Sequence, residues 1–374
     1  MKRRVLILIL LAVVAGTGCT RKFHLPRGEY PTDSAWRFSR ADQSGRAYLA
    51  THYSGQLNRR WQKKLSDRPV GPMSIGAGKL VVPVTRGKVH FYDLVSGRHL
   101  GRYNSKSNVQ SGVAIVDSLA YMALGPKKNR IVCLNLHNLR PVWRAALKDA
   151  SGPPIIEKNR LYLGSAAGWL ECRERMTGEI IWRDSAGARA LAGASLYDGI
   201  VYFPLDNGIV IGYEAETGTM MFRTDLEEPI VAKAAVGDML FVAGAEGHFF
   251  ALERKTGQVV WERLFDWPIW AAPAVDNDMV YIGDNGGFLR ALDKRTGRSV
   301  WTYKADGVIL ASPIVVGDYL LFASLDKHLY CLDKKSGLLN TRTKTRHEIR
   351  FPAISDGQSI YIATHGGIIQ CLGE

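Results

Sequence analysis

Cysteine, metal-ligand spacings, acidic residues and long apolar runs are all scarce in this sequence of 374 residues. It holds 5 cysteines, and no His-x-His or His-Glu-x-x-His spacing occurs, so the sequence does not support a metal site. The apolar run at residues 5–14 is too short to span a membrane comfortably. Basic residues outnumber acidic ones, 49 to 35, which gives a net charge of +14. A surface of that sign favours anionic lipid, acidic protein or nucleic acid as a partner.

The N-terminus has the form of an export signal. A charged stretch, Lys2-Arg3-Arg4, precedes the apolar run, and small residues follow it up to Cys19. We predict that residues 1–18 are a lipoprotein signal peptide, and export argues against a nucleic-acid partner.

Cys19 is the predicted lipidation site. Residues 15–19, Ala-Gly-Thr-Gly-Cys, resemble a bacterial lipobox, although Gly16 stands where an aliphatic residue is usual. The alternative is an ordinary signal peptide cut near Gly18. Thr20 follows the cysteine in place of Asp, which is similar to the outer-membrane address of Gram-negative lipoproteins.

What the sequence has in abundance is a repeat of about 40 residues, the mark of a repeat architecture. Its turn glycines follow one another at steps of 40, 39, 40 and 40; they are Gly178, Gly218, Gly257, Gly297 and Gly337.

Each repeat predicts four short antiparallel strands. Residues 288–293 alternate as a strand does, and Thr296-Gly297 supplies a tight turn. Trp301 follows four residues after that glycine, and one large aromatic side chain per repeat could fill the space between neighbouring sheets. Upstream, residues 273–275 and 279–283 read as two more strands. A four-stranded unit of this length is a propeller blade, so we predict an all-β, eight-bladed β-propeller over residues 56–374.

An N-terminal strand is predicted to close the ring. Residues 57–65 carry Trp61 and look like an outermost strand, whereas residues 351–372 supply three strands and then stop. Together they complete blade eight, and closure limits exposed sheet edges. Residues 19–55 are assigned to a lipid-anchored tether and a lead-in that includes Trp36.

The remaining cysteines occupy the strand position that Ala291 holds in its own repeat; they are Cys133, Cys172, Cys331 and Cys371. Their spacing would allow two disulfides between adjacent blades. Stacked sheets lie about 10 Å apart, however, and a disulfide needs Cα atoms within about 7 Å. We therefore expect free thiols packed as small residues.

The Ala-Leu-Asp, Thr-Gly and Trp pattern resembles the PQQ-like (quinoprotein-type) β-propeller superfamily over residues 36–374. The blade count, the lipobox and the basic charge resemble, more narrowly, the BamB family of lipoproteins in the β-barrel assembly machinery. That resemblance implies a non-catalytic, monomeric scaffold without a cofactor. It would be anchored by lipid at the periplasmic face of the outer membrane and would bind the barrel-assembly machinery as its protein partner.

Two other functions were weighed, a quinone-dependent dehydrogenase and a module that binds glycan or peptidoglycan in the cell envelope. Quinoprotein dehydrogenases typically carry adjacent cysteines, a calcium site and an Asp base, and no Cys-Cys pair occurs here. Asp266 and Asp306 lie in loops, where acids are usually solvated. The position at which each innermost strand begins is mostly apolar, offering few oxygen ligands and no paired carboxylates; it reads Val70, Gln110, Ser151, Leu191, Ile230, Trp270, Leu310 and Arg350. We predict no catalytic residues.

Two surface features are candidate partner sites. The loop Trp267-Pro268-Ile269-Trp270 has two aromatic side chains that could anchor an interface, the alternative being that one Trp packs beneath the loop. The outermost strands of blades seven and eight are strongly basic; they carry Arg342 and Lys344 on one and Arg59, Arg60, Lys63 and Lys64 on the other. The alternative for these charges is protection of sheet edges.

Overall fold

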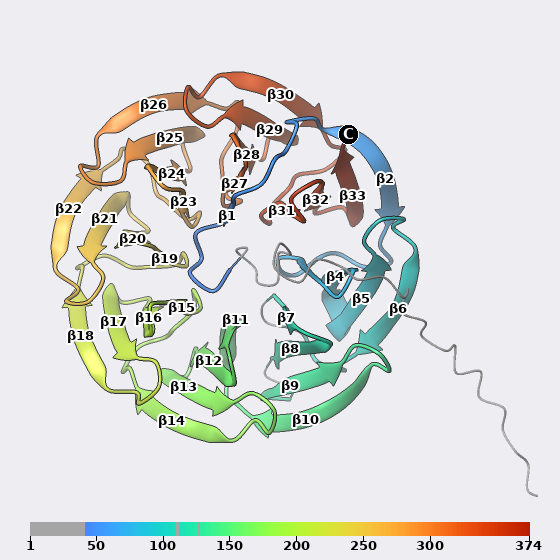
Figure 1. The fold of residues 1–374 in the computed structure, drawn as a ribbon, viewed down its shortest axis with the longest axis vertical. Helices are drawn as coiled ribbons and strands as arrows, with labels where there is room; N and C mark the ends of the chain where they lie inside the picture. Colours follow the sequence, from blue (N-terminus) through green and yellow to red (C-terminus); the bar gives the residue numbers. More distant parts are fainter. Residues whose placement is uncertain (1–41, 110–111, 126–127) are drawn as a thin grey trace, which may run out of the picture.

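The computed structural model describes residues 42–109, 112–125 and 128–374, which form a ring of eight blades around a central axis (Figure 1). Each blade is a four-stranded antiparallel sheet with its first strand innermost. The predicted all-β, eight-bladed propeller is therefore confirmed. Residues 1–18, Cys19 and Trp36 lie outside the described residues.

The strands follow the same order in every blade, from the axis outward. Blades one and two contain β3 (Ser74–Gly76), β4 (Lys79–Val84), β5 (Lys88–Asp93) and β6 (His99–Asn104), then β7 (Ala114–Val116), β8 (Leu119–Leu124), β9 (Arg130–Asn135) and β10 (Arg140–Ala146). Blades three and four contain β11 (Ala150–Glu157), β12 (Arg160–Ser165), β13 (Trp169–Glu174) and β14 (Ile180–Ser185), then β15 (Ser195–Tyr197), β16 (Ile200–Pro204), β17 (Ile209–Glu214) and β18 (Met220–Asp225).

The second half of the ring repeats this plan. Blades five and six contain β19 (Ala235–Val236), β20 (Met239–Ala243), β21 (His248–Glu253) and β22 (Val259–Leu264), then β23 (Ala274–Val275), β24 (Met279–Gly283), β25 (Phe288–Asp293) and β26 (Ser299–Lys304). Blade seven contains β27 (Ile314–Val316), β28 (Tyr319–Ala323), β29 (His328–Asp333) and β30 (Leu339–Lys344). Blade eight joins β31 (Ile354–Ser355), β32 (Ile360–Ala363) and β33 (Ile368–Gly373) to β2 (Asn58–Lys64).

The aromatic residue and the glycine of the repeat meet across blade junctions. The Trp301 indole of blade six donates to the backbone oxygen of Lys334 in blade seven at 3.1 Å. A Cβ added at Gly337 would collide with that indole, and Gly337 also has φ +72°, so both close approach and backbone favour glycine there. The close approach of an aromatic ring to a turn glycine occurs at five further junctions; the pairs are Trp61 with Gly97, Trp143 with Gly178, Trp182 with Gly218, Phe222 with Gly257, and Trp261 with Gly297.

The N-terminal strand closes the ring as predicted. β2 pairs antiparallel with β33, and Trp61 lies opposite Cys371. Its ring packs near Tyr361, with centroids 6.0 Å apart. β2 therefore supplies the outermost strand that blade eight lacks.

Residues 42–49, which we name the strap, line the inner edges of four blades. Backbone amides of blades four to seven donate to strap carbonyls. The first such bond runs from Leu196 N in blade four to Gln43 O at 2.9 Å, and the last runs from Gly317 N in blade seven to Leu49 O at 3.0 Å. Within it β1 (Tyr48–Leu49) pairs parallel with β27 as a fifth strand. Part of the segment assigned to the lead-in is thus built into the ring, where it covers an otherwise open sheet edge.

The four blade cysteines are buried and free, as expected. Burial raises the pKa of Cys133 and Cys172 to about 11 and that of Cys331 to about 12, and it raises the pKa of Cys371 as well. These thiols pack as small apolar side chains. In the ranges described here, no helix has the length and hydrophobicity needed to cross a membrane.

Candidate functional site

The predicted Trp loop is one of the eight links between blades, and all of these links lie on one face of the ring. There, each link between blades bonds to a hairpin of the blade that it enters, as when Asn285 N donates to Pro268 O at 2.9 Å. Asp206 N donates to Arg189 O in the same way two blades earlier, at 2.9 Å. We call this side the entry face, because every innermost strand starts from it. The Thr-Gly turns lie on the opposite face, since each strand reverses direction at its hairpin.

The Trp loop exposes both of its aromatic side chains. Trp267 is 48% exposed and Trp270 is 52% exposed, whereas Ile269 between them is fully buried. Trp267 rests against Gly286, where a Cβ would collide with the indole. Ile269 therefore fixes the loop to the core and leaves Trp270 presented to solvent.

Equivalent positions on neighbouring blades extend this apolar surface. Leu191 on blade four is 37% exposed and Val231 on blade five is 43% exposed. With Trp267 and Trp270 they form what we call the apolar crescent, over three successive blades. At the equivalent position of blade eight, Arg350 is exposed and charged. The exposed apolar residues are therefore on one side of the entry face and not all around it.

One predicted position is wrong. Ile230, assigned to this ring of entry positions, is 1% exposed and belongs to the core, and Val231 takes its place. The repeat does lose one residue in blade five, but the loss lies in the later turn at Gly237-Asp238, between β19 and β20. Positions before that turn keep the spacing of 40 from blade four.

Charged side chains border the apolar crescent. Arg189 Nε lies 2.5 Å from Asp206 Oδ2 beside Leu191. Asp266, next to Trp267, is exposed, as expected for a loop acid. Asp306 is exposed as well, but it lies toward the perimeter, 3.9 Å from Arg342. An apolar centre with a charged rim is the usual anatomy of a protein–protein contact.

The basic residues lie on the perimeter of the ring. β30 and β2 are the outermost strands of adjacent blades (Figure 1), and Asn340 Nδ2 donates to Gly55 O at 3.0 Å where they meet. Arg60 donates to Ser359 Oγ at 2.9 Å. The charged side chains are all exposed; they are Arg59, Arg60, Lys63, Lys64, Arg342 and Lys344. The ring thus brings together two basic strands that are far apart in sequence.

Several buried carboxylates and histidines that were not predicted as site residues have partners within the protein. The Glu228 carboxylate, buried, accepts from the amide of Gly247 at 3.0 Å and contacts the His248 ring. His90 Nδ1 lies 3.0 Å from His99 Nε2 across β5 and β6, and burial, with that neighbour, lowers the pKa of His90 to about 4. Glu171 binds Arg173 and Arg183 inside blade three. Across the described chain, no group of three His, Cys, Asp or Glu side chains could hold a metal ion.

An eight-bladed ring of this repeat, with an apolar site on one face, defines a PQQ-like propeller. A family profile described as outer membrane protein assembly factor BamB matches residues 166–373, more than half of the chain. The chain belongs to this family.

Curated relatives carry the same description over shorter stretches. BamB of Shewanella oneidensis is 24% identical over 112 residues, which is 28% of each chain. BamB of Burkholderia pseudomallei is 23% identical over 229 residues, which is 54% of this chain and 59% of that protein. The matched region thus spans between about a quarter and three fifths of these relatives.

Solved structures show the same fold. BamB from Moraxella catarrhalis superposes with a TM-score of 0.74 at 17% identity, covering 85% of this chain and 100% of that one. The quinohemoprotein alcohol dehydrogenase from Comamonas testosteroni gives 0.77 at 12% identity, covering 92% and 81%. An assembly factor and an enzyme share this ring, so function depends on the site and not on the fold.

Proposed function

We propose that this chain is a non-catalytic scaffold of outer-membrane β-barrel assembly, and that it docks a protein component of the assembly machinery on its apolar crescent. The observation that carries the proposal is the pair of half-exposed tryptophans beside Leu191 and Val231 on one face. Exposed aromatic side chains with an apolar surround and a charged rim are typical anchors of protein interfaces. Family membership supports the choice of partner.

The proposed location is the periplasmic face of the outer membrane, held by lipid on Cys19. The lipobox-like residues 15–19 support it. Cys19→Ala is expected to move the protein from the membrane fraction to the soluble periplasmic fraction. A variant that still sediments with membranes in high salt would show that lipid is not the anchor.

The docking surface is tested by recovery of the assembly machinery with tagged protein from solubilised membranes. Trp270→Ala is expected to reduce recovery by tenfold or more, since an interface anchor contributes about 2 kcal/mol or more. The melting temperature should hardly change, because the side chain is half exposed. Val95→Ala is the matched control: Val95 is 64% exposed, but it lies at a turn on the opposite face.

A collapse of stability in Trp270→Ala would assign this side chain to packing. Unchanged recovery at full stability would remove the apolar crescent as the docking surface. Cofactor absorbance after reconstitution with the quinone would favour a dehydrogenase, and retention on purified wall material would favour a glycan-binding module.

A further inference from the structure

The outermost strands of the ring divide into two arcs of different charge. On β30, β2, β6 and β10, the outermost strands of blades seven, eight, one and two, every charged residue is Lys or Arg. β2 carries four of them, β30 and β10 two each and β6 one, and all of these side chains are exposed. We call these four adjacent strands the basic arc.

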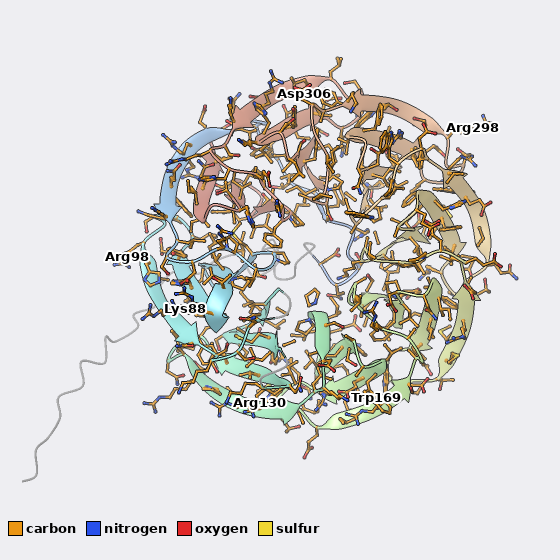
Figure 2. All side chains as sticks on the ribbon, turned by 180° about the vertical axis from the view of Figure 1, so that it is seen from behind. Lys88, Arg98, Arg130, Trp169, Arg298 and Asp306 are labelled. Atoms are coloured by element: carbon orange, nitrogen blue, oxygen red, sulfur yellow. The ribbon has the colours of Figure 1, made fainter. Side chains whose placement is uncertain are left out.

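Three of the other four outermost strands are balanced in charge. β14, β18 and β22 each carry one Arg and one acid, and β26 carries a single Lys. Exposed residues near the Thr-Gly turns of these strands are apolar, as is Leu339 at the start of β30; they include Ile180, Ile181, Met220, Met221, Val259, Val260 and Val300. Arg98 marks the basic side of the ring in Figure 2, and Arg298 lies on the opposite side.

Protection of sheet edges does not account for this division. Lys and Arg on an outer strand do prevent pairing with other sheets. All eight outermost strands present such an edge, however, and β14, β18 and β22 combine balanced charge with exposed apolar residues, so protection would be needed there at least as much. The positive charge is concentrated where β2 closes the ring.

Few acids stand near enough to neutralise the arc. Asp306 lies 3.9 Å from Arg342 at one end. Glu374 and Arg60 line the same pocket beside β2, and Arg60 also donates to the Ser359 hydroxyl. Lys63 and Lys64 are exposed at the middle of the arc. The arc therefore presents a positive field to the solvent along its length.

We propose that the basic arc rests on an anionic lipid surface, with the ring standing on its edge. Phosphate headgroups are the complementary charge, and a membrane is the partner broad enough to meet four strands together. The perimeter is convex, so a flat membrane touches β2 first. Charges on β30 and β6 lie to either side, and they contribute as far as about 8 Å, the Debye length at physiological salt. In this orientation the entry face stays open to a protein partner.

The experiment uses the mature chain, residues 19–374, with Cys19→Ala, so that attached lipid does not mask the effect. Sedimentation measures its partitioning onto vesicles of phosphatidylethanolamine with phosphatidylglycerol, and onto phosphatidylcholine alone, at low and at physiological salt. Each Lys or Arg near an anionic surface contributes about fivefold to partitioning. An arc variant, Arg59→Gln, Lys63→Gln, Lys64→Gln and Lys344→Gln, is therefore expected to bind at least about a hundredfold less.

A matched control removes the same charge from exposed positions of blades four to six: Arg223→Gln, Lys255→Gln, Arg295→Gln and Arg298→Gln. It is expected to bind within about fivefold of the parent, and both variants should keep the parent's melting temperature. Substituting Arg140 and Arg144 at the end of the arc should reduce binding less than substituting Lys63 and Lys64. Equal losses in arc and control variants, binding to phosphatidylcholine as strong as to phosphatidylglycerol, or no binding at low salt would each overturn the proposal. None of these outcomes depends on recovery of the assembly machinery.

Discussion

Six junctions between blades are sealed by an aromatic side chain over a glycine, whereas the junctions between blades one and two and between blades seven and eight lack both members. Gly101 and Thr341 stand where blades one and seven would carry the aromatic residue. Blade two has Asn138-Leu139 in place of Thr-Gly, and blade eight has no such turn because its outer strand comes from the N-terminus. The Trp and the Gly of one repeat thus serve different junctions, and a missing Trp is matched by a missing Gly in the next blade.

The two exceptional junctions are filled by other means. Between blades one and two, Leu100, Tyr103 and Leu139 pack against a buried hydrophobic cluster. Between blades seven and eight, Tyr53 meets Tyr319 edge to face with centroids 5.9 Å apart, and Gly55 bonds to Asn340. The lead-in segment seals the junction at which the repeat pattern ends.

The largest effect is expected from removing the strand that closes the ring. Deleting residues 56–66 removes β2 and the side chain of Trp61, which alone costs about 3–5 kcal/mol, and opens β33 as an edge. Denaturant unfolding should show a much lower midpoint and proteolysis should be faster. The triple variant Arg59→Gln, Lys63→Gln, Lys64→Gln is the control and should unfold like the parent. An unchanged midpoint in the deletion would refute closure by β2.

The next prediction separates two aromatic junctions. Trp301→Phe keeps an aromatic side chain at the junction but loses the indole N–H that binds Lys334 O, so it should lower the free energy of unfolding by about 1 kcal/mol. Trp61 Nε1 is buried without a hydrogen-bond partner among the described residues, so Trp61→Phe should be neutral or slightly stabilising. Equal losses in the two variants, measured by urea unfolding, would contradict the assigned roles of the two indoles.

A glycine substitution tests the other half of the same contact. Gly337→Ala introduces a Cβ into the Trp301 indole at φ +72°, and overpacking typically costs about 1–3 kcal/mol. Gly199→Ala has a similar φ, +74°, and open space around the added Cβ, so it should cost only the smaller backbone term. The difference between the two in thermal unfolding measures the junction; if they cost the same, the close approach adds nothing.

Alkali is expected to destabilise the fold through its buried thiols. The buried thiols keep their protons in the folded protein to about pH 11, whereas unfolded cysteines lose theirs near pH 8.5. Above the unfolded pKa the native state binds more protons, so stability falls as pH rises, by at most about 1.4 kcal/mol per pH unit per thiol. Cys133→Ala should reduce the slope of unfolding free energy between pH 9 and 11. A slope identical to the parent's would exclude this thiol as a contributor.

The repeat spacing was sufficient to predict the ring and its closure by β2, because both rest on side-chain periodicity. The unpaired cysteines followed from the distance between stacked sheets, which exceeds the reach of a disulfide. The strap was missed as a structural element because it bonds through backbone groups, and β1 spans only two residues, too few to show alternation. The position of Val231 was missed because a one-residue loss can be assigned to any turn within a repeat. The apolar crescent was predicted in part through Trp267 and Trp270. Its extension to Leu191 and Val231 was missed because the exposed fraction of a side chain cannot be read from the sequence pattern of a single blade.

Closure by β2 also sets the order in which this protein can fold. Gln370 Nε2 donates to Gln62 Oε1 across 308 residues, and the strap binds blades made long after it. Because the chain is synthesised from its N-terminus, the strap has no partner until blades four to seven have been made, and β2 has none until β33 has been made. Non-local pairing of this kind slows folding and leaves strand edges open to aggregation meanwhile. Blades can form one by one, but the closed ring is reached only after β33 has emerged, so β2 is an early segment that a chaperone would need to protect until then.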